Sequence, residues 1–215
     1  APSSASRRCQ GLHPRKSAAT CPRRARRRAS KDALIGQDGK YNTALPTKRI
    51  RQGSDGYEYV LSWAPETQIG RDIVITEADI DNLIRAKAAL YAGCQTLTSS
   101  VGITCAKFEQ VIVAGAFGTH IDIESGITIG LFPDIPRERF TFIGNGSLLG
   151  ARLVSFSADL LDDARMVARM VTNFELSENV DFMKNYIAAL FLPHTDIHNF
   201  PSVKKKLARL EKGRR

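Results

Sequence analysis

Two short glycine-rich segments carry the residue types best suited to binding a ligand through the backbone. The first contains Gly115, Ala116, Phe117 and Gly118, and the second contains Gly144, Asn145, Gly146 and Ser147. Each follows an apolar run and precedes a helical pattern. Glycine lets a ligand approach the backbone closely, and N–H groups at a helix start attract phosphate or hydroxyl oxygens. Ligands of open α/β sheets bind at the carboxyl ends of strands, so both segments could line one binding site.

Neither segment is diagnostic of a nucleotide by itself. Both differ from a Walker loop, which needs GK[ST], and from the G-x-G-x-x-G of dinucleotide sites. Asp122 and Glu124 begin the helix after the first segment, where their negative charge opposes a phosphate. The pattern therefore favours the sugar and base of a nucleoside over its phosphates. On chemistry alone, plain strand–helix corners remain the alternative.

The spacing of cysteines and histidines predicts no metal site. The cysteines at 9, 21, 94 and 105 form neither a C-x-x-C pair nor a ferredoxin-type cluster. His194 and His198 are four residues apart, but Pro193 argues against one continuous helix there. We expect Cys94 and Cys105 to be reduced, buried thiols. No residue is identified as a catalytic base.

The elements that position the two glycine segments alternate between helix and strand. The pattern predicts short strands and turns over residues 33–63, a helix over 76–97, a strand at 108–115, a short helix at 122–129, a strand at 139–144, two helices over 145–171, an edge strand at 173–176 and an amphipathic helix over 178–192. We expect ordered loop at 193–203. This order is typical of an α/β layer fold with a parallel component.

The helix over 76–97 has the clearest signals. Thr76 and Asp79 form a start like a capping box. The apolar side chains expected on one face are Ile80, Leu83, Ile84, Leu90, Tyr91, Cys94 and Leu97. Asp79, Asp81, Arg85 and Lys87 fall mostly off that face, which predicts a solvated surface for their charges.

The net charge of +9 is concentrated at the two ends. Residues 1–31 contain eight arginines, two lysines and no acid, and residues 204–215 contribute +6, which leaves −7 for residues 32–203. A nucleic-acid domain would instead carry basic residues on a folded face, with aromatic residues among them. Residues 1–31 have too few large apolar residues to build a core, so we expect disorder there. No apolar run is long enough to span a bilayer.

Three blocks, "DIVITEADIDNLIRAKAALYAGCQTL", "VIVAGAFGTHIDIESGITIGLFPDIPRERFTFIGNGSLLGAR" and "YIAALFLPHTDIHNFPSV", resemble the C-terminal part of the reductive activators of corrinoid proteins. Those activators are ATP-dependent iron–sulfur proteins of the sugar kinase, actin and heat-shock chaperone superfamily (ASKHA). The resemblance covers roughly residues 48–203. It implies an α/β fold: a ribonuclease-H-like lobe of the actin and sugar-kinase type, with a mixed sheet and flanking helices, here incomplete.

The resemblance also implies a function. "VIVAGAFG" matches the adenosine motif of the superfamily, which would bring Gly115, Ala116, Phe117 and Gly118 to the ribose and adenine of ATP. "GNGSLLGA" matches a later glycine turn of the same lobe. In the family, an N-terminal [2Fe–2S] domain delivers an electron to a corrinoid protein, and ATP with Mg²⁺ makes the reduction of Co(II) to Co(I) possible. The implied location is the cytoplasm, without a membrane.

The departures from the family pattern define the predicted domain organisation. The chain has no iron–sulfur cysteine cluster, and the phosphate loops and metal-binding acids of the first lobe do not occur in it. We expect a basic head foreign to the fold at 1–32, such as a truncated or frame-shifted sequence, then short strands and a linker at 33–70, the ASKHA-like lobe at 71–203, and a frayed basic tail at 204–215. The expected partners are a corrinoid protein, an N-terminal lobe and a ferredoxin-like domain, and a homodimer is a further candidate assembly. We expect no enzyme activity from the chain alone.

Other functional readings stay open at this point. Another ATPase or kinase fragment of the superfamily would share the glycine turns, although "IDNLIRAKAA" and "LFPDIP" argue for the activator family. A basic targeting peptide, or a nucleic-acid-binding protein acting through its termini, would owe its function to residues 1–31, and nucleic-acid binding would depend steeply on salt. An inert remnant would expose an apolar face and self-associate.

Overall fold

The structure is a computed structural model that describes residues 34–115, 118 and 120–212. Its helices and strands follow one another in the order β1 (Ile50–Gly53), β2 (Gly56–Ser62), β3 (Ile73–Thr76), α3 (Glu77–Ser100), β4 (Val111–Ala114), α5 (Ile123–Ile129), β5 (Phe140–Gly144), α6 (Gly146–Phe156), α7 (Ala158–Met170), α8 (Val180–Ala189) and α9 (Pro201–Lys212). The predicted mixed α/β class is confirmed.

The first three strands form an antiparallel sheet in the order β1-β2-β3. Strands β1 and β2 are joined at the predicted Asp-Gly turn, where Gly53 lies opposite Gly56 and Gly56 has a φ of 99°. That conformation is open to glycine at little cost. Strand β3, which the sequence analysis did not identify, leads directly into α3.

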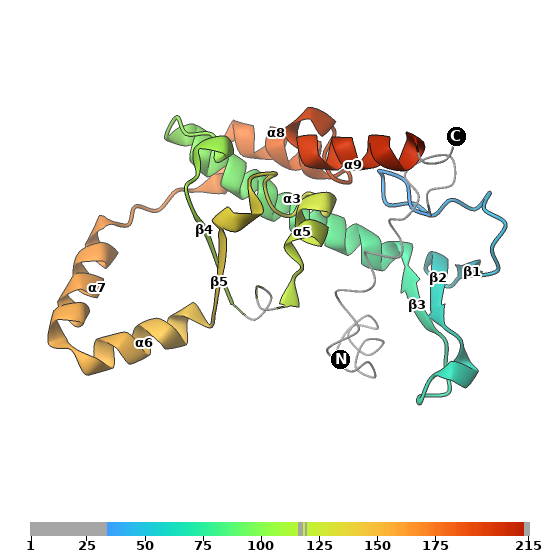
Figure 1. Ribbon diagram of the computed structural model, residues 1–215, viewed down its shortest axis with the longest axis horizontal. Helices are drawn as coiled ribbons and strands as arrows, with labels where there is room; N and C mark the ends of the chain where they lie inside the picture. The colour runs from blue at the N-terminus through green and yellow to red at the C-terminus, as the bar shows by residue number, and fades with distance from the viewer. Residues whose placement is uncertain (1–33, 116–117, 119, 213–215) are drawn as a thin grey trace.

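Helix α3 begins at the predicted capping box. The Thr76 hydroxyl accepts a hydrogen bond from the Asp79 amide, and the Asp79 carboxylate accepts one from the Thr76 amide. The helix then crosses the molecule and packs against residues of both sheets (Figure 1). Ile80 and Ile84 pack in a core with residues of the three-stranded sheet, whereas Ala88 lies in a second core with β4 and β5.

Strands β4 and β5 form a separate parallel pair. Val111 lies opposite Phe140 and Val113 opposite Phe142. Helix α5 lies between them in the chain, and its start at Asp122 and its end near Ile129 are as predicted. The strands are thus divided between two sheets, whereas the sequence analysis expected one mixed sheet.

The buried face of α3 differs from the predicted one. Leu83, Leu90 and Leu97 are exposed, as is Cys94, while Lys87 is completely buried. Helix α8 packs along α3, and the small residues buried on α3 are Ala88, Ala92, Gly93 and Thr96. Small side chains let two helices approach closely, and the large leucines are left at the flanks. The Lys87 ammonium is held by the carbonyl oxygens of Phe191 and Pro193, at 2.5 and 2.7 Å.

The C-terminal part departs from prediction in two places. Residues 173–176 form no strand, and the extended backbone there leads into a 3₁₀ turn at Leu176–Glu178. Helix α9 begins at Pro201, inside the stretch predicted as loop, and the tail predicted to fray is helical as far as Lys212. Val203 is buried and Leu207 packs against the same core, so an apolar stripe holds α9 in place. The division at residue 70 stays a prediction, and residues 1–33 lie outside the described part.

Candidate functional site

The two predicted glycine turns lie side by side. Strands β4 and β5 run parallel, so their carboxyl ends meet at the same edge, at Ala114 and Gly144. The Gly115 amide donates a hydrogen bond to the Gly144 carbonyl oxygen at 2.6 Å. The Gly118 amide closes the first turn by donating to the Gly115 carbonyl oxygen at 3.1 Å. Ala116 and Phe117 were predicted to belong to the site and lie outside the described residues.

Two of the four glycines have backbone conformations that favour glycine. Gly115 has a φ of 99° and Gly144 a φ of 64°, both in the region that L side chains rarely adopt. A Cβ atom placed on either residue would meet no atom of the described residues within 4 Å, its chain neighbours aside. The described part of the protein therefore leaves open space beside both backbones, which is the condition for a ligand to lie against them.

The other two glycines are packed against the strands. A Cβ atom on Gly118 would lie 2.9 Å from Val113 Cγ1, and one on Gly146 would lie 3.3 Å from Ala114 Cβ. Gly146 is the first residue of α6, so its small size lets the helix start directly over the end of β4. The role of these two glycines is to bring the backbone close to the sheet.

Asn145 and Ser147 differ in what they do. The Asn145 side-chain oxygen accepts a hydrogen bond from the Leu148 amide at 3.0 Å and caps α6. This is an ordinary helix cap, with Asn among the preferred residues. Ser147 is exposed in the first turn of α6. Asn145 thus has a structural task that the sequence analysis did not assign to it.

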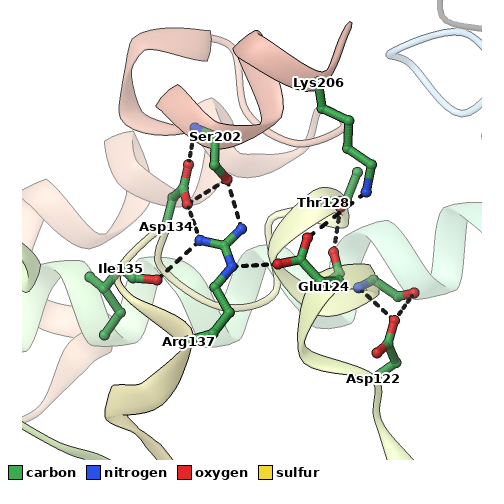
Figure 2. Close-up of polar contacts among 9 residues, drawn as sticks. Asp122, Glu124, Thr128, Asp134, Ile135, Arg137, Ser202 and Lys206 are labelled. Atoms are coloured by element: carbon green, nitrogen blue, oxygen red, sulfur yellow. Dashed lines mark hydrogen bonds and ion pairs between the residues drawn. The ribbon is translucent and has the colours of Figure 1, made fainter. Parts of the chain in front are cut away.

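The carboxylates at the start of α5 are engaged within the protein, as Figure 2 shows. Asp122 caps α5 by accepting hydrogen bonds from the Ser125 amide and hydroxyl, at 3.1 and 2.7 Å. Glu124 forms an ion pair with Arg137 at 2.5 Å and lies 3.9 Å from the Lys206 ammonium. Negative charge already occupies this helix start, so the first turn is poorly suited to a phosphate group.

Arg137 joins α5 to the start of α9 (Figure 2). Besides Glu124, its guanidinium donates to the Asp134 carboxylate at 2.9 Å and to the Ser202 hydroxyl at 2.8 Å. Asp134, whose side chain is only 2% exposed, also accepts a hydrogen bond from the Ser202 amide at 2.6 Å. Burial alone lowers the pKa of Arg137, but the bonds to Glu124 and Asp134 outweigh it and raise the pKa. The guanidinium therefore stays charged.

Sequence reasoning missed this network because its members are distant in the chain. Asp134 and Ser202 are 68 residues apart. The one local signal is the close spacing of Asp134, which lies between Pro133 and Pro136, and Arg137, which directly follows Pro136. The network holds the helix that follows the first glycine turn.

The thiols and acids do not form a metal or cluster site in the described part of the chain. No group of three or more His, Cys, Asp and Glu side chains is arranged there to hold a metal ion. Cys94 and Cys105 are free, and burial raises the pKa of the Cys105 thiol. Iron–sulfur clusters are held by several thiolates, so these residues do not fit a [2Fe–2S] group. A helix able to span a bilayer is likewise not found among the described residues.

Comparison with known proteins finds similar chains among proteins that act on corrinoid proteins. The chain is 36% identical over 124 residues to the corrinoid activation enzyme RamQ of Eubacterium limosum, which is 58% of this chain and 21% of that protein. It is 32% identical over 104 residues to a [Co(II) methylated amine-specific corrinoid protein] reductase of Methanosarcina barkeri, covering 48% of this chain and 19% of that one. The chain thus spans about a fifth of the length of these curated relatives.

A solved structure, titled reductive activator for corrinoid, iron–sulfur protein, shares the fold with a TM-score of 0.74 and 45% identity. It covers 80% of this chain, which in turn covers 28% of that chain. Residues 27–204 match the family described as the C-terminal domain of RACo, the ASKHA domain. The chain therefore belongs to this family of ASKHA domains of corrinoid reductive activators.

Proposed function

We propose that this domain supplies the nucleoside side of an ATP site in a reductive activator of corrinoid proteins. One observation carries the proposal: the Gly115 amide and the Gly144 carbonyl are hydrogen bonded, and both backbones face open space. The two turns would thus lie against the ribose and adenine, with Ala116, Phe117, Gly118, Asn145, Gly146 and Ser147 completing the site.

The phosphate side of the reaction belongs to other parts of the activator. Phosphoryl chemistry needs groups that position the phosphates and a metal ion that neutralises their charge. The described residues offer no acidic cluster for Mg²⁺, and Asp122 and Glu124 oppose a phosphate at the α5 start. We assign Mg²⁺ binding to an N-terminal lobe and the [2Fe–2S] group to a ferredoxin-like domain. The domain alone is inactive in this account.

The partner in this role is a corrinoid protein, whose Co(II) is returned to Co(I) with the help of ATP. The printed names of the relatives, an activation enzyme and a Co(II) corrinoid reductase, support this assignment. The role places the protein in the cytoplasm, and a homodimer is compatible with it. Another ATPase or kinase of the superfamily is the alternative, but the activator names of the relatives favour the corrinoid role.

The test is a calorimetric titration of adenosine, ADP and ATP into the chain, with and without Mg²⁺. We expect adenosine to bind weakly, and the phosphates and Mg²⁺ to change its affinity by less than about tenfold, or 1.4 kcal/mol. Uridine serves as the control for base recognition. Strong dependence on the phosphates would contradict the assignment, and so would equal binding of uridine.

A further inference from the structure

Two cysteine thiols flank the turn that joins the end of α3 to the segment before β4. Cys94 lies on α3 and is exposed, whereas Cys105 begins a 3₁₀ turn at Cys105–Lys107 and is half-buried. Both thiols are free, and neither takes part in the proposed nucleoside contact. Thiols at such positions are accessible to small reagents, so their mutual geometry decides which chemistry they can undergo.

The chain turns back on itself between the two cysteines. The Gly102 amide donates a hydrogen bond to the Ser99 carbonyl oxygen at 3.0 Å, and the Ile103 amide donates one to the Thr98 carbonyl oxygen at 2.9 Å. Together with the φ of 69° at Gly102, these bonds form a Schellman motif at the end of the helix. Ile103 therefore lies beside the last turn of α3 rather than beyond it.

The two segments that flank this motif have matching lengths. Along the helix, the four-residue step from Cys94 to Thr98 rises about 6 Å. The two-residue step from Ile103 to Cys105 spans about 7 Å when extended. Thr104, between them, is extended, with a φ of −106° and a ψ of 148°. A segment that runs back along α3 thus brings Cys105 level with Cys94.

The Thr98 side chain indicates that the segment does run back along the helix. Its hydroxyl donates to the Cys94 carbonyl oxygen at 2.9 Å and is also a hydrogen-bond partner of the Cys105 thiol. Partial burial raises the pKa of the Cys94 thiol, and the neighbouring Cys105 adds to this rise. Burial likewise raises the pKa of Tyr91 to about 12, and both thiols contribute to that rise. The two thiols therefore lie near the same turn of α3.

We infer that Cys94 and Cys105 form a redox-active dithiol, which a low-molecular-weight disulfide oxidises to an intramolecular disulfide. In the first step the more exposed Cys94 thiolate attacks one sulfur of the small disulfide, whose S–S bond breaks, and one small thiol leaves. The Cys105 thiolate then attacks the Cys94 sulfur of this mixed disulfide and displaces the second small thiol. The protein gives up two electrons and two protons, which the two small thiols carry away.

The disulfide links α3 to the segment that enters the smaller sheet. The Arg139 guanidinium donates to the carbonyl oxygens of Ala106 and Phe108, at 3.1 and 2.7 Å, so this segment is also held at the start of β5. Oxidation closes the short loop between Cys94 and Cys105 and restrains the entry to β4, whose other end leads into the first glycine turn. The inference is independent of the proposed nucleoside contact.

The experiment uses the full chain with Cys9→Ser and Cys21→Ser, which leaves Cys94 and Cys105 as its two thiols. The folded protein is equilibrated with reduced and oxidised glutathione at about pH 8.5, where more of each thiol is ionised. Trypsin then releases both cysteines in one peptide, residues 88–107. We expect this peptide to resist alkylation and to lose about 2 Da, the mass of two hydrogens, and dithiothreitol should reverse both changes.

Unfolded protein is the matched control for the contribution of the fold. The equilibrium constant for closing the disulfide should be at least about tenfold larger in the folded protein than in urea, because the fold holds the two thiols in reach of each other. Cys105→Ser should stop at one glutathione bound to Cys94, since no second thiol displaces it.

Four results would overturn the inference. Glutathione retained on Cys94 when Cys105 is present would show that the thiols do not reach each other. A disulfide-linked dimer would pair Cys94 with another chain. Equal closing constants in folded and unfolded protein would show that the fold does not bring the pair together. A Cys105→Ser variant that takes up no glutathione would exclude Cys94 as the attacking thiol.

Discussion

At the scale of single residues, the Asp134–Arg137 pair bears most directly on the support of the site. The Asp134 carboxylate is buried and depends on Arg137 and Ser202 for its hydrogen bonds. A buried charge that loses its partner is costly, whereas exposed ion pairs contribute little. The hydrogen bonds from Arg137 and Asp134 to Ser202, which is distant in the chain, are what we expect to stabilise the fold, rather than the number of ion pairs.

Replacing Arg137 by Met should therefore destabilise the protein by about 2 kcal/mol. The matched control is Arg165→Met, because the Arg165–Asp162 pair is exposed on both sides, at 63% and 73%, and should cost less than about 0.5 kcal/mol. Urea unfolding of the two variants measures the difference. Equal midpoints would show that the network contributes no more than a surface pair.

The burial of His194 predicts that the stability of the protein depends on pH. Its ring lies 5.5 Å from that of Tyr91 and 6.2 Å from that of Phe200, measured between centroids. Burial lowers the pKa of His194 below its ordinary 6.5, and the nearby Lys87 ammonium acts in the same direction. The folded state thus favours the neutral ring, and the unfolded state takes up the proton more readily.

The unfolding free energy should consequently be highest above pH 6.5 and should fall as the pH drops through 6.5 towards the lowered pKa. His194→Asn keeps a hydrogen-bond acceptor for the Asp196 amide and should flatten this slope between pH 7 and 5. His198→Asn, at an exposed position, should leave it unchanged. Urea unfolding at several pH values decides, and an unchanged slope in His194→Asn would assign the dependence to other groups.

At the scale of elements, the end of α5 is fixed by contact with a distant loop. Gly130 ends the helix with a φ of 75°, and a Cβ atom there would lie 2.2 Å from the Pro193 carbonyl oxygen. Gly102 also ends a helix region with positive φ, but it has no atom within 4 Å of an added Cβ. Substituting alanine at each of these two glycines therefore distinguishes the cost of backbone strain from the cost of a steric collision.

Gly102→Ala should cost about 1 kcal/mol, which is the strain alone. Gly130→Ala carries the same strain and a collision with backbone, so it should cost about 2 kcal/mol more. Thermal unfolding of the two variants checks this expectation. Similar losses would mean that the loop at Pro193 moves aside freely.

The elements around the glycine turns could be predicted from local signals. Neighbouring residues in the sequence determine the Thr76 cap, the apolar run of β4 and the start of α5 at Asp122. The buried face of α3 could not be predicted, because it depends on packing against α8, which lies distant in the chain. In the structure Ala88 and Ala92 are buried, and Leu83 and Leu90 are exposed. The adjacency of Gly115 and Gly144 followed from parallel pairing. The cap on α9 came from Asp134, 68 residues away, and has no local signature.

At the scale of the whole molecule, one helix connects two separate sheets, and the two glycine turns lie at the end of the smaller sheet. That pair of strands is covered on its core side and open on its other side. The chain spans about a fifth of the length of its curated relatives. In the proposed function, the complete reaction therefore draws on parts other than this domain. In the proposed function, the described residues contribute nucleoside contact, because the glycine turns offer backbone beside open space.

The most direct measurement is the affinity of adenosine for Gly144→Ala and Gly102→Ala. Both positions have positive φ, at 64° and 69°, and among the described residues neither has an atom within 4 Å of an added Cβ, chain neighbours aside. The two variants therefore carry similar strain, and only the methyl group at 144 lies where we place the nucleoside. The account predicts adenosine binding at least about tenfold weaker in Gly144→Ala and unchanged in Gly102→Ala. Equal affinity in both variants would contradict it.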